Sequence, residues 1–258
     1  ITAQSTGSGN AGNVTIQGHA SPAQSVVIDG GVISTDTEDT GTGGNIFMHA
    51  DSVTIQNGAF LNAQTTGSGS AGRVEITATN RVVVSDSTIT SGSFSDAPTA
   101  GDAGQIILTS PIIDLQPAST LATAAFGSGN AGNITLQTNR LTASNSEVTS
   151  SVAGQGQGGA VTVRGLAGPE TSAQEITLSD NSQILTVTSN FDPNLPGEGA
   201  AGSIVLATGN LNLSGISKIS AETLFSRGHA GNIDVTAGGQ VTIESNSEVS
   251  SRSIAGVD

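Results

Sequence analysis

A six-residue pattern, in which a small residue and a glycine precede alternating aliphatic residues, recurs in phase along the whole chain. The copies are AGNVTI (11–16), GGNIFM (43–48), AGRVEI (71–76), AGQIIL (103–108), AGNITL (131–136), GGAVTV (158–163), AGSIVL (201–206) and AGNIDV (230–235). The second-position glycines of successive copies are 32, 28, 32, 28, 27, 43 and 29 residues apart, so the period is about 28 with insertions. Such self-similarity restricts the chain to a repeat architecture, because no single copy can bury its own apolar face.

Each period contains three short runs in which aliphatic residues alternate with Ser or Thr. In the fifth copy these runs are residues 134–136, 141–143 and 148–150. The alternation predicts strands with one buried and one solvated face. Turn-forming residues such as Asn57 and Gly58 separate the second run from the third, and they suit sharp corners because they tolerate positive φ.

Strands this short become stable when each pairs in parallel with its counterpart one period away, about 4.8 Å distant. The inward aliphatic residues then form columns, one of which contains Ile16, Met48, Ile76, Leu108, Leu136, Val163, Leu206 and Val235. The sequence therefore predicts an all-β, right-handed parallel β-helix over residues 1–258. We expect one solenoid of about eight coils, with three short strands in each coil.

Four copies of the spacing Gly-x-Gly-x-x-Gly, at residues 7–12, 67–72, 127–132 and 197–202, match the spacing of a dinucleotide-binding loop. That loop requires a following helix whose amino terminus holds the pyrophosphate, whereas each copy here runs into a strand. Four copies would also compete for a role that needs only one. We therefore interpret the glycines as corners of the repeat and expect no cofactor.

Composition excludes several classes of partner. The chain carries 7 Lys and Arg against 21 Asp and Glu, a net charge of −14, and such a surface repels phosphate backbones. No nucleic-acid partner is therefore expected. Cysteine is absent, which excludes disulfides and thiolate-bound metals. The sequence also contains no apolar run of 18 residues and no signal-peptide pattern at its amino terminus.

Both ends of the sequence fall inside the repeat. Leu121 and Val148 each precede the next second-position glycine by 11 residues, and the same interval from Val249 reaches position 260. We therefore expect a segment of a longer protein that stops within a coil. Bare parallel strands at such ends predict end-to-end self-association.

Residues 126–136 (FGSGNAGNITL) and 141–151 (LTASNSEVTSS) resemble the central repeats of filamentous-haemagglutinin-like exoproteins, and the coil length is similar to that of cyanobacterial members. The resemblance covers essentially the whole chain. It implies export by two-partner secretion through an outer-membrane transporter, and display as an adhesin on the outer surface of a Gram-negative bacterium or release from it. The family's secretion domain carries an Asn-Pro-Asn-Leu motif, which residues 192–195 (DPNL) approach but do not match at the first position. We interpret these residues as a turn.

The function expected from the repeat is that of a structural shaft in a cell-adhesion protein, without enzymatic activity. A carbohydrate-active or carbohydrate-binding β-helix is the alternative, and an ice- or surface-binding solenoid is a third. The acidic residues Glu75 and Asp102, or Asp234 and Glu244, are isolated in phase, and the three histidines fall at different coil positions. Neither set therefore predicts the paired groups that glycoside hydrolysis needs.

Acidic loops leave weak calcium binding open, although no Ca²⁺-binding nonapeptide repeat occurs. The acidic side chains concerned are Asp36, Glu38, Asp39, Asp192 and Glu198.

Insertions are where repeat proteins usually place specificity. They lie at residues 17–25, 93–101, 164–175 and 187–199. The second and fourth leave the same corner three coils apart, roughly 15 Å along the rod. We predict that any ligand, a cell-surface glycan or protein, contacts these two loops. The candidate contact residues are Phe94, Asp96, Phe191, Asp192 and Asn194.

A further recurrence follows the third runs. Phe94, Phe126, Phe191 and Phe225 lie five to seven residues after the aliphatic residue of that run, and Val152 and Ile254 take a similar place in other coils. The recurrence predicts a hydrophobic column packed at one corner.

Overall fold

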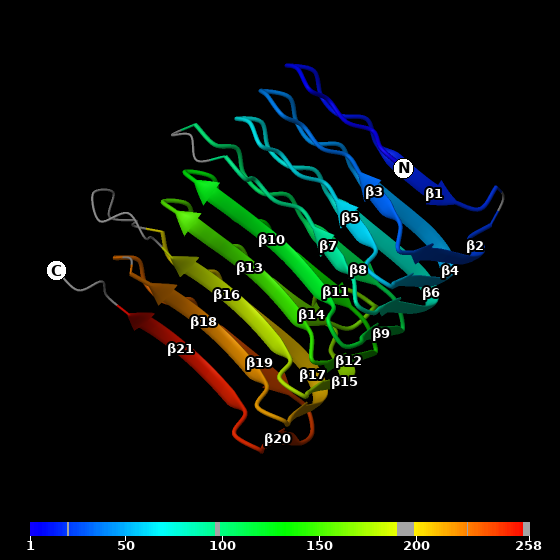
Figure 1. The fold of residues 1–258 in the computed structure, drawn as a ribbon. Coiled ribbons are helices and arrows are strands. Elements are labelled where there is room, and N and C mark those ends of the chain that lie inside the picture. The colour runs from blue at the N-terminus through cyan, green and yellow to red at the C-terminus, as the bar shows by residue number, and fades with distance from the viewer. Residues whose placement is uncertain (20, 96–98, 190–198, 226, 255–258) are drawn as a thin grey trace.

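The structure is a computed structural model that describes residues 1–258 except 20, 96–98, 190–198, 226 and 255–258. All regular elements of the described residues are β-strands, stacked in parallel into two sheets (Figure 1). One sheet has 13 strands and holds the first and second strands of the coils, while the other has 8 strands and holds the third. The predicted parallel β-helix of about eight coils is confirmed. None of the described residues forms a helix of the length and apolarity that crossing a membrane requires.

The bounds of the strands follow the repeat. First strands are β1 (Val14–Gln17), β8 (Ile106–Thr109), β11 (Ile134–Gln137), β14 (Val161–Arg164) and β19 (Ile233–Ala237). Second strands are β2 (Ala23–Asp29), β9 (Ile112–Leu115), β12 (Arg140–Ser144), β15 (Ala173–Ser179) and β20 (Val241–Ile243). Third strands are β3 (Val32–Ser34), β5 (Phe60–Asn62), β7 (Thr88–Thr90), β10 (Thr120–Gly127), β13 (Glu147–Gly154), β16 (Gln183–Ser189), β18 (Lys218–Leu224) and β21 (Glu248–Ile254).

In the second, third and seventh coils the first and second strands join into one long strand. These long strands are β4 (Ile46–Gln56), β6 (Val74–Val84) and β17 (Ile204–Leu213). The two parts of each still pair with separate strands, as β4 does with β1 and β2. The pairing of β4 with β6 contains a register shift between Ala50 and Ser52, where β6 has one more residue than β4. In the fourth coil Pro111 separates β8 from β9, because proline has no N–H to donate to the ladder.

The interior is a set of stacked aliphatic columns, as the alternation predicts. Met48 pairs with Ile76, and Leu136 pairs with Leu108 on one side and with Val163 on the other. These side chains are almost completely buried. Burying each large aliphatic side chain contributes about 1.5–3 kcal/mol, so the columns are the main source of stability.

The last part of the third strand and the path from it to the next first strand form a thin double layer that the sequence did not predict. We call it the flange; in the fourth and fifth coils it comprises residues 123–132. Thr123 donates a hydrogen bond from its hydroxyl to the carbonyl oxygen of Gly132 at 2.7 Å, across the two layers. Thr186 makes the same contact with Gly202 at 2.6 Å. The chain therefore runs outward, turns at the tip of the flange and comes back against itself.

Stacked glycines allow neighbouring coils of the flange to approach closely. A Cβ on Gly132 would overlap the carbonyl oxygen of Gly104 in the preceding coil, and one on Gly129 would overlap that of Gly101. Neither Gly129 nor Gly132 has a positive φ. The interpretation of the motif glycines as corners is confirmed. Close approach of two backbones is what requires Gly129 and Gly132, whereas Gly127 of the same motif has a positive φ of 66°.

Asparagines beside the flange connect coils through their side chains. The Asn133 carboxamide oxygen accepts a hydrogen bond from the N–H of Ala160 in the next coil at 2.7 Å. Asn45 accepts one from the N–H of Arg73 at 2.8 Å in the same way. Elsewhere, the turn before the third strand does use positive φ, at Asn57 and Gly58 among others, as predicted.

The predicted aromatic column is only partly present. Phe94 and Phe126 contact each other, with ring centroids 5.4 Å apart. The register then pairs Phe126 with Ala153, and Val152 points inward to a small buried cluster with Ala103 and Ala125. The sequence spacing misassigned Val152 because a one-residue difference moves a side chain to the opposite face of a strand.

Candidate functional site

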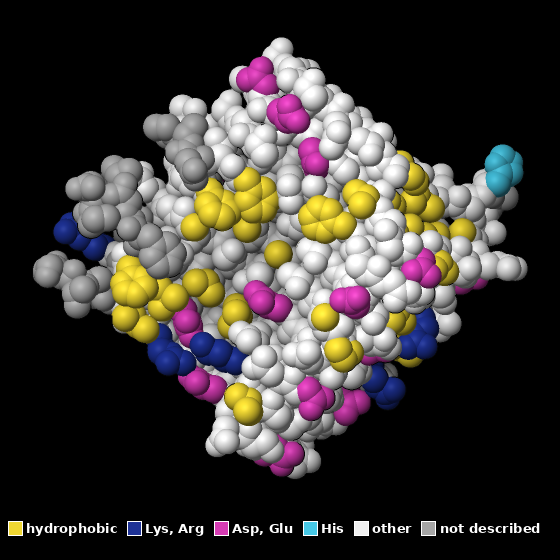
Figure 2. Space-filling view, in the orientation of Figure 1, with side chains coloured by type: hydrophobic (Ala, Val, Ile, Leu, Met, Phe, Trp, Pro, Cys, Tyr) yellow, Lys and Arg dark blue, Asp and Glu magenta, His cyan; other side chains and the backbone are white. Residues whose placement is uncertain are grey.

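The predicted contact loops are represented in the structure mainly by Phe94. Phe94 is 38 % exposed, and its ring packs on that of Phe126 in the flange. The other candidate residues, Asp96, Phe191, Asp192 and Asn194, lie outside the described residues. Figure 2 shows one face of the molecule, on which small hydrophobic clusters are separated by polar surface and scattered acidic side chains.

The other two insertions extend the connections between first and second strands. The gap from β1 to β2 lies within residues 17–25, and that from β14 to β15 lies within residues 164–175. Within the latter, the Thr171 hydroxyl donates to the Gly168 carbonyl oxygen at 2.8 Å, which closes a tight turn.

An ionic cluster joins the seventh and eighth coils on the outer face of the smaller sheet. Glu222, only 9 % exposed, forms ion pairs with Lys218 and, at 3.8 Å, with Arg252. The Ser220 hydroxyl donates to the same carboxylate at 2.6 Å, and Arg252 also pairs with Glu248. Burial raises the pKa of Glu222, but the hydrogen bonds from Lys218 and Ser220 and the two positive charges together lower it below its ordinary value of 4.5.

Replacing Glu222 by glutamine is expected to destabilise the protein by about 1–3 kcal/mol at pH 7, because charge-assisted hydrogen bonds are lost. A lowered folded pKa means that the carboxylate stabilises the fold above pH 4.5, and that this contribution disappears as the pH falls through the lowered value. Urea unfolding of both proteins from pH 7 down to pH 3 measures the difference, which should shrink with acidity.

Glu175→Gln is the matched control for this substitution. Glu175 pairs with Arg140 at 3.3 Å, and both side chains are more than a third exposed. Exposed pairs contribute less than about 1 kcal/mol. Equal effects of the two substitutions at pH 7 would contradict a special role for the Glu222 cluster.

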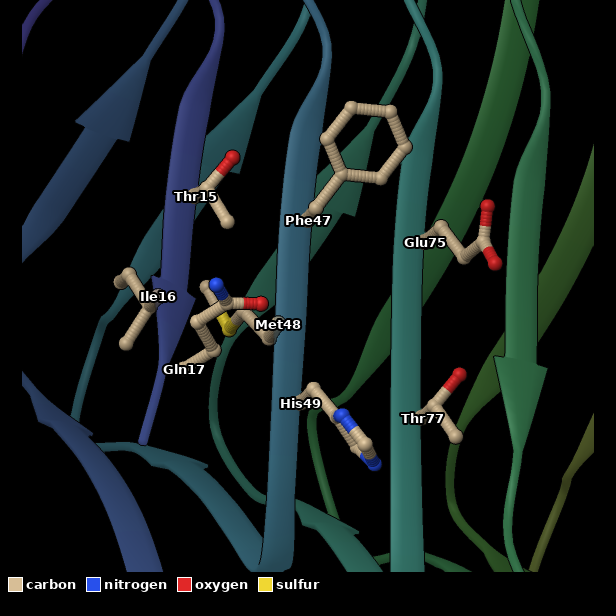
Figure 3. A pocket seen from close by; sticks show the side chains of 8 residues that line it. All are labelled: Thr15, Ile16, Gln17, Phe47, Met48, His49, Glu75 and Thr77. Atoms are coloured by element: carbon tan, nitrogen blue, oxygen red, sulfur yellow. The ribbon is translucent and has the colours of Figure 1, made fainter. Parts of the chain in front are cut away.

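A small pocket lies on the outer face of the larger sheet, across β1, β4 and β6 (Figure 3). Its volume is about 230 Å³. Parallel pairing places two rows of outward side chains beside each other, and Figure 3 shows both rows. One row contains Thr15, Phe47 and Glu75; the other contains Gln17, His49 and Thr77.

Charged neighbours contact the aromatic ring of this pocket. The Arg73 guanidinium lies over the Phe47 ring, 5.3 Å from its centroid. The same guanidinium is 2.7 Å from a carboxylate oxygen of Glu75. Ring, cation and carboxylate therefore form one connected group, in which Arg73 contacts both Phe47 and Glu75.

Sequence reasoning missed this pocket, although the signal was present. Comparison by coil position made Glu75 and His49 look isolated, because neither type recurs from coil to coil. Outward residues of neighbouring strands are nevertheless close in space. The register pairs His49 with Thr77, which is two residues after Glu75 on the same face of β6, so His49 and Glu75 are diagonal neighbours. The informative feature was the aromatic Phe47 at an outward position of a first strand.

In the described part of the chain, no three His, Asp or Glu side chains come together in a way that could hold a metal ion. Of the acidic residues considered for weak calcium binding, Asp192 and Glu198 lie outside the described residues. The Asp36 carboxylate instead accepts hydrogen bonds from the Ser34 hydroxyl at 2.7 Å and the Asn62 amide at 3.1 Å. The second of these contacts links neighbouring coils.

Comparisons with known proteins provide no relative. No family model, no curated protein and no solved structure matches the chain. The stacked architecture, the ionic cluster and the Phe47 pocket are therefore the starting points for a functional proposal.

Proposed function

We propose that this chain is a shaft segment of a secreted, haemagglutinin-like adhesin that holds adhesive parts away from a cell surface. The observation that carries the proposal is the unbroken stacking of third strands from β3 to β21, each paired in parallel with the next. Such a ladder lengthens the molecule by about 4.8 Å per coil and gives it a fixed direction. The proposed role is mechanical and requires no catalytic groups.

The proposed location is the exterior or outer-membrane surface of a Gram-negative bacterium, reached through an outer-membrane transporter of the two-partner type. The resemblance of residues 126–136 to haemagglutinin-like repeats supports it. The absence of cysteine also suits passage across membranes in an unfolded state. Cell-surface glycans or proteins are the proposed partners, and end-to-end contact with further copies is a second mode of association.

Antibodies against the purified chain test the location. We expect them to label intact cells of the organism that makes the protein, and to lose that labelling when the gene of the proposed transporter is disrupted. Labelling that appears only after the cells are permeabilised would overturn the proposal.

Deleting one complete coil tests the shaft role. Removing residues 132–158 joins Ala131 to Gly159 and keeps the repeat in phase. If the coil acts as a spacer, secretion and attachment to a surface should both persist. Deleting residues 132–145 alone breaks the phase and should abolish secretion of folded protein. Loss of attachment by a secreted, folded in-phase variant would show a specific binding role for that coil and contradict the spacer function.

A further inference from the structure

The geometry of the Phe47 pocket points to a binding site for one uncharged pyranose ring of a saccharide. This inference adds a partner class to the proposed adhesive role. It depends only on the arrangement of three neighbouring coils, and not on how the protein is exported.

An aromatic ring among polar groups suits the binding of a sugar ring. The C–H face of a pyranose is apolar, whereas its edge carries hydroxyl groups. The half-buried Phe47 ring lines the pocket and offers an apolar surface. Arg73 contacts the ring but does not line the pocket, so the cation does not occupy the space proposed for the sugar.

Hydrogen-bonding groups surround the ring at the spacing of the sheet. Gln17 offers an amide, Glu75 a carboxylate and His49 an imidazole, and each comes from a different strand or a different row. Side chains on one face lie about 6.6 Å apart along a strand and about 4.8 Å apart between strands, the scale of a single sugar ring. An amide and a carboxylate together can donate to and accept from the hydroxyls of the sugar.

The volume and charge of the pocket restrict the class of ligand further. At about 230 Å³ the pocket is smaller than the roughly 300–1,000 Å³ typical of sites for drug-sized molecules, so it has room for one ring. Arg73 and Glu75 neutralise each other in their ion pair. The pocket thus has no excess positive charge to attract an acidic sugar or a phosphate.

His49 provides a direct test, because its side chain belongs to the outward row that lines the pocket. Protein labelled with ¹³C in its histidines should show a His49 ring resonance, which the spectrum of a His49→Gln variant assigns. Titration with methyl glucoside, methyl galactoside and methyl mannoside is expected to shift this resonance in a saturable way for at least one sugar. Phe47→Ala should weaken that binding about tenfold, the effect of losing an aromatic contact.

Two further variants keep the test informative. Phe60 lies on β5 in the other sheet, so Phe60→Ala should leave binding unchanged. Gln17 is exposed at the end of β1, so Gln17→Ala should fold normally and weaken binding several-fold. Circular dichroism confirms that each variant is folded.

Four outcomes would overturn the inference. They are no shift with any of the three sugars, an equal shift with cyclohexanol, stronger binding of glucuronate than of the neutral sugars, and unchanged binding by folded Phe47→Ala. None of these would affect the proposed shaft role, which surface labelling and coil deletion test separately.

Discussion

Replacing Ile134 by aspartate is expected to destabilise the protein by more than about 4 kcal/mol, the largest effect of any single substitution considered. Ile134 is completely buried and lies between Ile106 and Val161 in the stacked column. A carboxylate there would have neither water nor a counter-ion, and the packing of both neighbouring coils would be lost. Urea unfolding followed by far-UV circular dichroism measures the loss.

Hydrogen exchange should locate the damage from this substitution. Stacked coils contact only their neighbours, so unfolding can be partial. We expect the amides of β8 and β14, the partners of β11, to lose protection first.

Thr135→Asp is the matched control on the same strand. Thr135 points outward, is only partly buried, and lies between Ile107 and Thr162. The new charge would face water, so the change should stay below about 1 kcal/mol. A strand slipped by one residue would reverse the two results, because every side chain would then change faces. An unchanged stability of Ile134→Asp would therefore contradict the register.

The fold could be predicted from the sequence because its signals are local and repeated. A period of two within each run identifies the buried face, and a period of about 28 identifies the partner strand. Column neighbours such as Met48 and Ile76 then follow from alignment alone. No comparable signal exists for the candidate contact residues Asp96, Asp192 and Asn194, since insertions interrupt the repeat and have no counterpart in the next coil.

The Phe47 pocket is a feature that the repeat pattern does not predict. Its side chains differ from coil to coil, so alignment by coil position treats each as an exception. Only the pairing of Phe47 with Thr15 on one side and Glu75 on the other reveals that three exceptions are neighbours. In a solenoid, residue types that recur at the same coil position therefore indicate the interior, whereas residue types that occur in one coil only indicate a surface site.

The flange could not be predicted, because glycine recurs for more than one physical reason. Positive φ requires glycine at some positions, such as Gly58 with φ of 77°, and close backbone approach requires it at others. The sequence shows a glycine in both cases. Substituting alanine for glycine and measuring stability distinguishes the two reasons.

Gly132→Ala is expected to destabilise the protein by about 3 kcal/mol, because its Cβ would overlap the Gly104 carbonyl oxygen and lie 2.6 Å from the carbonyl carbon. Gly12 is the matched control, since it ends an identical GSGNAG motif. A Cβ on Gly12 would meet only the Ala3 side chain, at an ordinary 3.4 Å.

Gly12→Ala should therefore change the stability by no more than about 1 kcal/mol in either direction. Neither Gly12 nor Gly132 has a positive φ, so alanine can adopt both backbones without strain. If glycine were needed only to turn the chain, the two identical motifs would respond equally to alanine. A large cost at Gly132 together with a small one at Gly12, measured by urea unfolding of both variants, would instead assign the glycine requirement to the stacking of one coil on the next.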